Sequence, residues 1–547
     1  MLADSPQRSR SVRYRFTDPG HSAAMNFSPV EFATLKSRLP YDLVSFAPEL
    51  LLVITIVLVL LMRLFRAFDR VHLYPVAFVP VAFALAITIA HGATLASNAQ
   101  RGEAFGGLLA LDGFAAFLRS LLLVFALLAL LLGRLTGLPD RRDSADGAVL
   151  LLGAILGFMV MVSANHLLMV FVGLEMASLP CYALAAFLKG KRSGSEAALK
   201  YVLYGSAASG VALYGLSLLT VRFGGGSMPL FIDGLADMAR GGQLEAFTAT
   251  GLLMLFAGLA FKLSAVPFHA WCPDVFEGAA AEVGALLSIA SKTAAFGLLL
   301  RWLVAVQQGV GIIDPNFLPP LVAPILMAVA ALSMTLGNLA ALGQTSLKRL
   351  LAYSTIAQAG TMLCGAVALS PDGASAILVY LIGYLPANFV AFGIVAHLRN
   401  TTGAETVEQL RGSLKREPAL ALALALALLS LLGLPPLVGF AGKFQVFVAL
   451  FEASAHWLST GYPLLGTAGF VLLGVAVLNT AASAGYYLRL LKVAILDDAS
   501  DAPEPAPHRP GLVAFLALVS LSTIVLGLSW NPLAALAAEA VRGFVAG

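Results

Sequence analysis

The sequence predicts an all-α polytopic membrane protein with about fourteen transmembrane helices. Hydrophobic residues fill 59% of its 547 positions and charged residues only 12%, about half of the ~25% that a soluble domain carries. Long apolar runs recur from residue 47 to residue 530 and are separated by short polar segments. The formal net charge of +4 is small for this length and gives no indication of a nucleic-acid partner.

Fourteen apolar segments are each long enough to cross a bilayer, which takes about 20 residues of helix. In chain order they cover residues 47–65, 73–96, 113–134, 146–164, 166–188, 197–221, 246–270, 280–304, 318–341, 347–369, 374–398, 418–450, 464–492 and 511–530. The last residues, 531–547, are predicted to form a short amphipathic helix lying at the membrane surface.

Residues 1–45 are predicted to form a polar N-terminal tail. Its basic residues include Arg8, Arg10, Arg13 and Arg15. No apolar stretch of signal-peptide type follows them. The natural start is either the first residue, with a basic tail, or Met25, which precedes a short lead into the first span.

The lysines and arginines outside the spans predict the orientation. Loops with odd numbers, counted from the first span, hold eighteen of them, whereas the even loops and the C-terminal segment hold five. These five are Arg101, Arg222, Arg240, Arg301 and Arg542. Cytoplasmic loops carry an excess of Lys and Arg, so the odd loops are predicted to be cytoplasmic. Both termini then lie outside, which is the periplasm for a bacterial inner membrane.

Two spans contain prolines close to a lysine. Span 7 has Pro267 five residues after Lys262, and span 12 has Pro435 and Pro436 before Lys443. Proline removes a backbone donor and clashes with the preceding turn. Non-helical backbone at membrane depth is tolerated only where it is buried in protein or lines water. We therefore expect spans 7 and 12 to be broken helices.

The two breaks lie five spans apart, so they also predict a repeat. Because five is odd, a unit of spans 4–8 and a unit of spans 9–13 would have inverted orientations. Interrupted helices at matching positions of inverted repeats indicate a transport site. The predicted organisation is the tail (1–45), spans 1–3 (46–140), a first repeat (146–306), a second repeat (316–495), and the last span with the tail helix (508–547).

Charged side chains inside the apolar runs are the strongest functional signal. They are Glu175, Lys200, Lys262, Lys292 and Lys443. A charge at mid-bilayer costs about 2.5–3.5 kcal/mol on insertion scales, and such residues mark ion paths. Burial disfavours the ammonium form of lysine, whereas a nearby carboxylate favours it. A glutamate that approaches and leaves a lysine would therefore switch that lysine between keeping its proton and passing it on.

Each of these residues also has a structural interpretation. Glu175 would then be a static partner of a lysine, and Lys262 and Lys443 would extend toward the membrane surface. Lys200 has Glu196 four residues earlier, which is the spacing of an ordinary helix ion pair. Lys292 is too far from both ends of its span to reach the surface easily.

Arg119 is the fifth cation within a span. An arginine does not lose its proton in proteins, so we expect it to pair with a carboxylate or to reach the membrane interface. Asp112, about two turns earlier, is a candidate partner.

Other polar residues in the spans have two interpretations each. His269, in the span 7 break, would relay protons between lysines or form an ordinary buried hydrogen bond. Tyr380, Tyr384 and Asn388 recur every four residues and share one helix face. They would hold the waters of a proton wire or bond neighbouring helices.

The sequence contains no motif for several kinds of binding site. The three cysteines, Cys181, Cys272 and Cys364, are isolated from one another, so no metal, haem or iron–sulfur site is expected. Neither a phosphate-binding loop nor a dinucleotide fingerprint is present. We therefore expect no cofactor in this chain, and energy for transport must come from an ion gradient or from a partner.

The chain resembles the antiporter-like N subunits in the membrane arm of bacterial NADH:quinone oxidoreductase, respiratory complex I. The stretches that carry the resemblance are 173–180 (GLEMASLP), 196–201 (EAALKY), 262–278, 287–292 (LSIASK), 347–360 (LKRLLAYSTIAQAG) and 435–444. The resemblance extends over about residues 45–530. A lysine rather than a glutamate at 443 separates the chain from the M-type relatives, and the lack of a long lateral helix separates it from the L-type.

The resemblance implies a role for each buried charge. Glu175 would be the span 5 carboxylate and Lys262 its span 7 partner. Lys292 would be the central lysine, Lys443 the lysine nearer the opposite exit, and Lys200 the extra span 6 lysine of N-type subunits. Flavin and iron–sulfur clusters are expected in partner subunits, which would bind NADH and quinone.

One stretch departs from the family pattern. After Gly278 the family usually has Pro-Thr-Pro-Val, whereas this chain has Ala279-Ala-Ala-Glu282-Val283. Without these prolines the start of span 8 is expected to be more regularly helical. Glu282 is interpreted as an interfacial charge or, alternatively, as a group that takes up protons at the cytoplasmic edge.

The sequence therefore predicts a proton-translocating subunit of NADH:quinone oxidoreductase, driven by quinone reduction elsewhere in the complex. Its expected partners are the M-type antiporter-like subunit, the small K-, J- and A-type membrane subunits and the lipid bilayer. The first alternative is a subunit of a multisubunit cation/proton antiporter or a membrane-bound hydrogenase. The second is a structural piece of the membrane arm whose charges only hold helices together.

Overall fold

The computed structural model describes residues 29–68, 71–98, 102–188, 190, 192–415, 417–498 and 510–545. Some residues used in the sequence predictions lie outside these ranges. They are Arg8, Arg10, Arg13, Arg15 and Met25 of the tail, and Arg70, Arg101, Lys189, Lys191, Arg416 and Arg509 of the loops.

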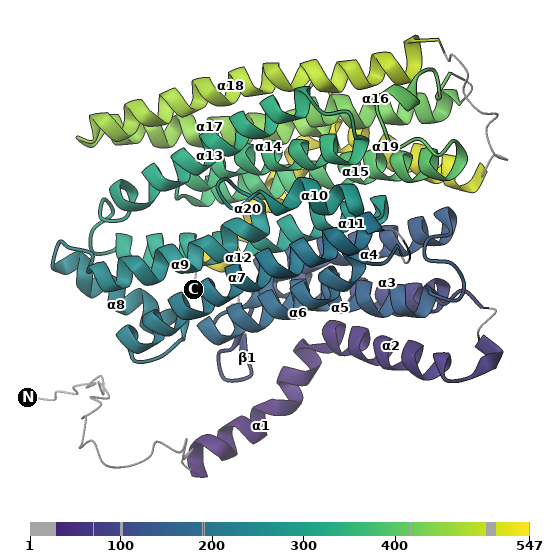
Figure 1. The fold of residues 1–547 in the computed structure, drawn as a ribbon. Helices are drawn as coiled ribbons and strands as arrows, with labels where there is room; N and C mark the ends of the chain where they lie inside the picture. Colours follow the sequence, from purple (N-terminus) through teal and green to yellow (C-terminus); the bar gives the residue numbers. More distant parts are fainter. Residues whose placement is uncertain are drawn as a thin grey trace, which may run out of the picture.

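The described residues form a bundle of long helices that run roughly parallel or antiparallel to one another (Figure 1). Thirteen helices are long and apolar enough to cross a membrane, and a bent pair at the N-terminus brings the number to fourteen. The spans are α2 (Ala47–Arg63), α3 (Tyr74–Asn98), α4 (Gly113–Thr136), α5 (Ser144–Ser163), α6 (Leu167–Ala185), α7 (Arg192–Phe223), α9 (Ala246–Leu263), α11 (Ala281–Ser288) with α12 (Ala290–Gly311), α13 (Pro319–Leu342), α14 (Leu347–Val367), α15 (Pro371–Thr401), α16 (Pro418–Leu432) with α17 (Val438–Ser459), α18 (Pro463–Leu491) and α19 (Pro510–Leu528). The predicted all-α membrane fold is confirmed.

Both predicted breaks are present. α9 ends at Leu263, and residues 264–270 are non-helical before the short helix α10 (Trp271–Gly278) begins. The predicted span 7 was therefore seven residues too long. In span 12 the break covers residues 433–437, between α16 and α17. Gly433 ends α16 in the left-handed conformation, with φ 89°, which glycine adopts without steric cost.

The expectation that span 8 starts more regularly without the family prolines is wrong. Ala279 and Ala280 have extended backbone with ψ of 166° and 149°, so α11 begins only at Ala281. A second irregularity at Ile289 separates α11 from α12. The interruption is therefore present with alanines at positions 279 and 280.

Several elements were not predicted. The predicted polar tail ends in a helix, α1 (Pro29–Ser45), which meets α2 at an angle of 75° (Figure 1). The loop between α3 and α4 holds a hairpin of β1 (Gly102–Ala104) and β2 (Leu109–Leu111). The loop between α7 and α9 holds the amphipathic helix α8 (Met228–Arg240). Three-residue and five-residue helical turns cover Arg66–Phe68, Glu408–Leu410 and Lys492–Leu496.

The C-terminal amphipathic helix is present as α20 (Trp530–Val545). Ala537, Ala540 and Val541 on one face are buried, whereas Glu539 and Arg542 are exposed. This helix packs against α4 and α15. Its place at the membrane surface stays a prediction.

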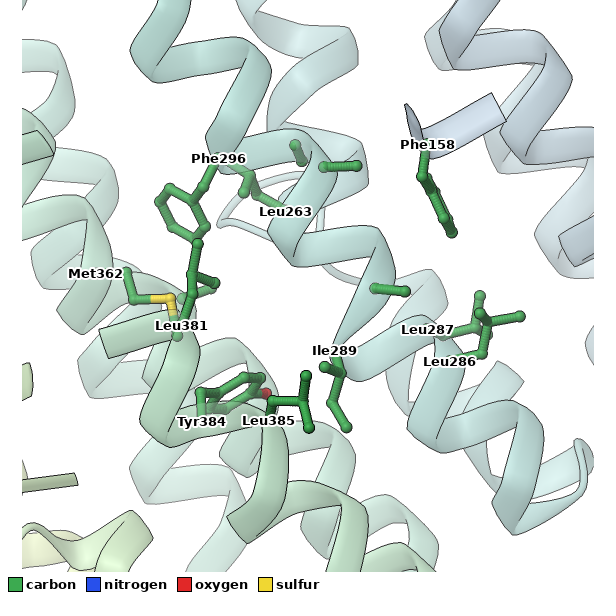
Figure 2. Close-up of a cluster of buried hydrophobic side chains, with 14 of the residues drawn as sticks. Phe158, Leu263, Leu286, Leu287, Ile289, Phe296, Met362, Leu381, Tyr384 and Leu385 are labelled. Carbon is green, nitrogen blue, oxygen red and sulfur yellow. The ribbon is translucent and has the colours of Figure 1, made fainter. Parts of the chain in front are cut away.

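The core lies where the two predicted repeats meet. The most apolar window of the α11–α12 span is entirely buried, and those of α14 and α15 are 94% buried, whereas that of α7 is 28% buried. Figure 2 shows part of this core, in which Leu287, Ile289 and Phe296 of span 8 cluster with Met362 of α14 and Leu385 of α15. The span that carries Lys292 is therefore enclosed by protein on all sides. The inverted relation between the two units and the domain limits stay predictions.

Candidate functional site

Lys292 is completely buried on α12 and is held by the break in span 7. Its Nζ donates hydrogen bonds to Oγ of Ser264, at 2.8 Å, and to the backbone oxygen of Leu287, at 3.3 Å. Ser264 is the residue that ends α9, in a left-handed conformation with φ 57°. The amine also lies 5.7 Å from the ring centre of Trp271 and 6.0 Å from that of Phe276, within cation–π range.

Lys443 is held by the break in its own span. Its side chain is 6% exposed, and Nζ donates to the backbone oxygens of Leu431, at 2.9 Å, and Leu432, at 3.0 Å. These are the last residues of α16. The final carbonyls of a helix lack partners within the helix and carry the negative end of its dipole. The break at Gly433 therefore places carbonyl oxygens where the amine needs them.

Glu175 and Lys262 lie close enough for their charges to interact but do not form an ion pair. Lys262 is 3% exposed, and its Nζ has no hydrogen-bond partner among the described residues. Glu175 is half-buried near the middle of α6, and its Oε1 is buried without a partner. The predicted pair is therefore near but open in this conformation.

Lys200 belongs to an ion network near one end of the bundle rather than to the buried line. Its Nζ lies 2.9 Å from Oε1 of Glu196, as the spacing predicted, and 2.7 Å from Oδ2 of Asp274. Arg349 binds the other oxygen of Asp274 at 2.7 Å and Glu277 at 2.8 Å. Burial alone would raise the pKa of Asp274, but the hydrogen bonds from Lys200 and Arg349 hold that pKa below its ordinary value.

His269 does not bond to a lysine among the described residues. It is half-buried in the non-helical segment after α9, and its Nδ1 is buried without a partner. The neighbouring Pro267 and Phe268 are exposed. The structure therefore places His269 in the break, as predicted, but does not connect it to Lys262 or Lys292.

Two groups of hydroxyl and amide side chains, not predicted in this form, lie beside the residues that bind Lys292 and Lys443. Next to Leu287, Oγ of Ser288 lies 2.7 Å from the hydroxyl of Tyr384 and 2.9 Å from that of Thr355. Gln358, three residues after Thr355 on α14, donates at 3.0 Å to the backbone oxygen of Leu431, which also accepts from Lys443.

The side-chain amide of Gln358 also forms hydrogen bonds with two tyrosines. Gln358 donates to the hydroxyl of Tyr487 at 3.0 Å and accepts from the hydroxyl of Tyr380. Tyr380 and Tyr384 therefore bond between helices, and Asn388 reaches only the Tyr384 backbone oxygen, at 3.4 Å. Gln358 and Tyr487 were missed because single polar residues in apolar helices give no periodic signal. The polar run around Gln358 in 347–360 was the only available clue.

The arginines within the spans have other partners than predicted. Arg119 pairs with Glu49 of α2 at 3.0 Å, not with Asp112. Asp112 instead forms a fully buried bidentate pair with Arg301, at 2.6 and 2.9 Å. Arg301 was counted as a loop residue but lies inside α12, so one of the five residues in the even loops is removed and the predicted charge bias becomes stronger.

Glu282 faces an arginine rather than a lysine of the relay. Its carboxylate pairs with Arg399 of α15 at 3.2 and 3.3 Å, and both side chains are 13% exposed. This pair joins the start of span 8 to the end of α15. The interpretation of Glu282 as an edge charge fits this contact better than a free group that takes up protons.

Comparisons with known proteins show the family of this chain. The family described as NADH:quinone oxidoreductase/Mrp antiporter, transmembrane region, matches residues 164–482. NADH-quinone oxidoreductase subunit N of Anaeromyxobacter sp. is 37% identical over 523 residues, which cover 93% of this chain and 97% of the relative. The chain belongs to the NADH-quinone oxidoreductase subunit N family.

Two solved structures contain chains that are similar to this one. A chain of respiratory complex I from Thermus thermophilus, solved with bound aureothin, is 32% identical with a TM-score of 0.70, covering 90% of this chain and 99% of that one. A chain of the Mrp complex from Dietzia sp. has a TM-score of 0.74 at 19% identity, covering 91% and 97%. The second similarity shows the shared fold alone.

Proposed function

We propose that this chain carries protons from the cytoplasm to the outside as a membrane-arm subunit of NADH:quinone oxidoreductase. Glu175 and Lys262 would form the switch, Lys292 the central carrier and Lys443 the carrier nearer the exit. Lys200 and His269 would have secondary roles in proton transfer. As a translocase subunit, the chain would hold no redox group, and the flavin, iron–sulfur clusters, NADH and quinone would be bound by partners.

The observation that carries the proposal is the hydrogen bonding of Lys292. An ammonium group has three N–H donors, and the neutral amine has two. Lys292 has two neutral acceptors, the Ser264 hydroxyl and the Leu287 carbonyl, with no carboxylate in ion-pair contact among the described residues. Both N–H bonds of the neutral amine are therefore satisfied, and the third donor of the charged form remains available to pass a proton on.

The charges of the open Glu175–Lys262 pair supply the means of control. When Glu175 approaches Lys262, the ammonium of Lys262 is stabilised and repels a second charge on Lys292. When Glu175 withdraws, burial favours loss of the Lys262 proton. A proton can then reach Lys292, and the Ser288–Tyr384 and Gln358 groups lead from there toward Lys443.

The setting follows from the family and from the charge distribution. The odd loops would face the cytoplasm and both termini the periplasm, in a bacterial inner membrane. The drive would come from quinone reduction in partner subunits and reach this chain through the M-type subunit or the small K-, J- and A-type subunits. Identity of 37% to an N subunit, against 19% to the Mrp chain, favours this function over that of a cation/proton antiporter subunit.

The test is Lys292→Ala in the assembled complex, with NADH:quinone turnover and proton uptake measured in proteoliposomes. We expect a loss of about tenfold or more in coupled activity, since a positioned proton carrier contributes at least that much. Lys415→Ala is the matched control, because Lys415 pairs on the surface with Asp498, which is fully exposed. Activity and proton transport at the wild-type level in the Lys292 variant would overturn the proposal.

A further inference from the structure

An open pocket of about 610 Å³ lies where α4 ends and α3 and α19 begin. These three helix ends are found at the same end of the bundle (Figure 1). The connections that meet there are odd-numbered loops, so the charge distribution predicts that this end is cytoplasmic. The pocket therefore lies at the level where spans leave the membrane. Its lining is His72, Arg134, Leu135, Gly137, Pro139, Asp140, Arg141, Gly511 and Leu512.

The two arginines give this pocket a positive charge. Arg134 and Arg141 are exposed, and neither forms an ion pair with a described residue. Asp140 is the one acidic residue of the lining, and its Oδ1 accepts a hydrogen bond from the backbone nitrogen of Asp143 at 2.9 Å. One aspartate against two arginines leaves a net positive charge. A planar guanidinium donates to two phosphate oxygens at once, so arginines are well suited to bind this group.

His72 lines the same pocket and has a ring nitrogen without a hydrogen-bond partner. The residue is 7% exposed. Its Nδ1 accepts from the backbone nitrogen of Tyr74 at 3.4 Å, so the neutral ring carries its proton on Nε2, and no described group accepts a hydrogen bond from Nε2. Burial and the two arginines lower the pKa of His72, whereas the nearby Pro139 carbonyl raises it. A buried donor beside two arginines favours an anion as the ligand of this pocket.

An apolar stripe on α4 leads from the pocket toward the middle of the membrane. Half-buried or exposed side chains recur there at spacings of three and four, which places them on one helix face; they are Leu121, Val124, Leu128, Leu131 and Leu135. Leu135 lines the pocket, whereas Leu121 and Val124 line a separate, largely apolar groove between α3, α4 and α20. Val124 is eleven residues before Leu135, or about 16.5 Å along the helix axis. This length is close to the ~15 Å that one leaflet contributes to the hydrocarbon core.

We propose that this pocket binds the headgroup phosphate of an anionic phospholipid from the leaflet on this side, with an acyl chain lying along the α4 stripe. Arg134 and Arg141 would hold the phosphate oxygens, and Nε2 of His72 would donate to a phosphate or ester oxygen. Basic pockets between spans on the cytoplasmic side are typical sites for such headgroups. Free phosphate would use the same donors, but only a lipid would also use the stripe. The inference does not depend on proton transport through Lys292.

The test uses the assembled complex in nanodiscs that contain phosphatidylglycerol with a photoactivatable acyl chain, and the labelled peptides are mapped by mass spectrometry. We expect labels on residues 121–135 of α4. Replacing both Arg134 and Arg141 by glutamine should lower this labelling about tenfold or more, because each basic residue near an anionic lipid contributes roughly fivefold. The matched control replaces Arg66 and Arg142 by glutamine. Both are exposed arginines in the same odd-numbered loops but outside the pocket lining, so labelling should stay at the wild-type level.

A second variant and two further probes complete the test. His72→Phe keeps an aromatic ring but removes the Nε2 donor, so labelling should fall a few-fold; this variant serves where the double arginine variant does not assemble. Phosphatidylcholine with the same photoactivatable chain should label weakly, because its headgroup has no net charge. Wild-type labelling in either variant, or equal labelling by the two lipids, would overturn the inference. Loss of labelling on addition of millimolar inorganic phosphate would assign the pocket to free phosphate and would overturn the choice of a lipid.

Discussion

The two predicted five-helix units each hold a buried lysine at a broken helix, but the lysine is held in different ways. In the first unit the break in span 7 supplies a hydroxyl to Lys292 of the next span. Nζ of Lys262 and Oε1 of Glu175 have no hydrogen-bond partner among the described residues. In the second unit Lys443 binds the carbonyl ends of its own broken span. Among the described residues, Lys443 has neutral partners only.

This difference separates two tasks. Charges that can pair or part, Glu175 and Lys262, are found in the first unit, so the control of proton movement is expected there. The second unit offers a fixed site with neighbouring neutral groups, Gln358 and Tyr487, which suits transfer without control. The comparison predicts that variants in the first unit affect coupling most and that variants in the second unit reduce rates by smaller factors.

Loss of the carboxylate in the first unit should have the largest effect. Glu175→Gln removes the carboxylate that is proposed to control the proton on Lys262, so we expect coupled quinone reductase activity to fall about tenfold or more. The measurement is NADH:quinone turnover with proton transport in membranes. Glu452→Gln, at an exposed glutamate of α17, is the control. Equal activity in the two variants would remove the proposed difference between the units.

Replacement of the lysine in the second unit should come next. Lys443→Ala removes the donor that the structure gives the Leu432 carbonyl and leaves the Leu431 carbonyl with Gln358, and an unsatisfied buried polar group costs about 1–3 kcal/mol. We expect a several-fold loss of proton transport and a lower thermal stability of the complex. Turnover and melting temperature are the two readouts. A loss as severe as that of Glu175→Gln, without a change in stability, would show that the second unit also controls coupling.

Much of this arrangement could be predicted from the sequence, because the energetic cost of a charge in an apolar run and the spacing of prolines and lysines indicate it. A lysine in an apolar run is expensive, so Lys292 and Lys443 stood out, and prolines beside Lys262 and Lys443 marked both breaks. Pairing between distant helices could not be predicted. Arg119 has Asp112 seven residues earlier, yet Glu49 binds it. Arg301 was counted with the loops although it lies inside the predicted span 280–304, and its partner Asp112 is 189 positions away.

A smaller effect is expected from the hydroxyl that joins Gln358. Tyr487→Phe removes the hydrogen bonds of this hydroxyl to Gln358 and Ser354, and each bond is worth about 1 kcal/mol or roughly fivefold in rate. The adjacent Tyr486→Phe is a matched control, since its hydroxyl bonds Asn338 instead. Steady-state turnover in membranes distinguishes them. If both phenylalanine variants behave alike, the Gln358 group has no part in transfer between the two lysines.

The smallest effect concerns the network of Lys200. The pKa of Asp274 is held below its ordinary value, so its contribution to stability is present at neutral pH and is lost as the pH falls through that lowered value. Asp274→Asn should lower the melting temperature of the complex slightly near pH 7, by an amount that corresponds to about 1 kcal/mol or less. The difference from wild type should shrink below about pH 4, near the ordinary pKa of aspartate. A difference that is constant with pH would contradict the assignment.

The most direct test of buried lysines as proton carriers is proton transport by the assembled complex with Lys292→Arg. Arginine keeps the positive charge and can still donate to Ser264 and Leu287, but it does not release its proton. If Lys292 gives up and regains a proton in each cycle, transport should be lost although the complex assembles. Transport at the wild-type rate with arginine at this position would contradict the account, and the buried charges would then serve only to hold the helices together.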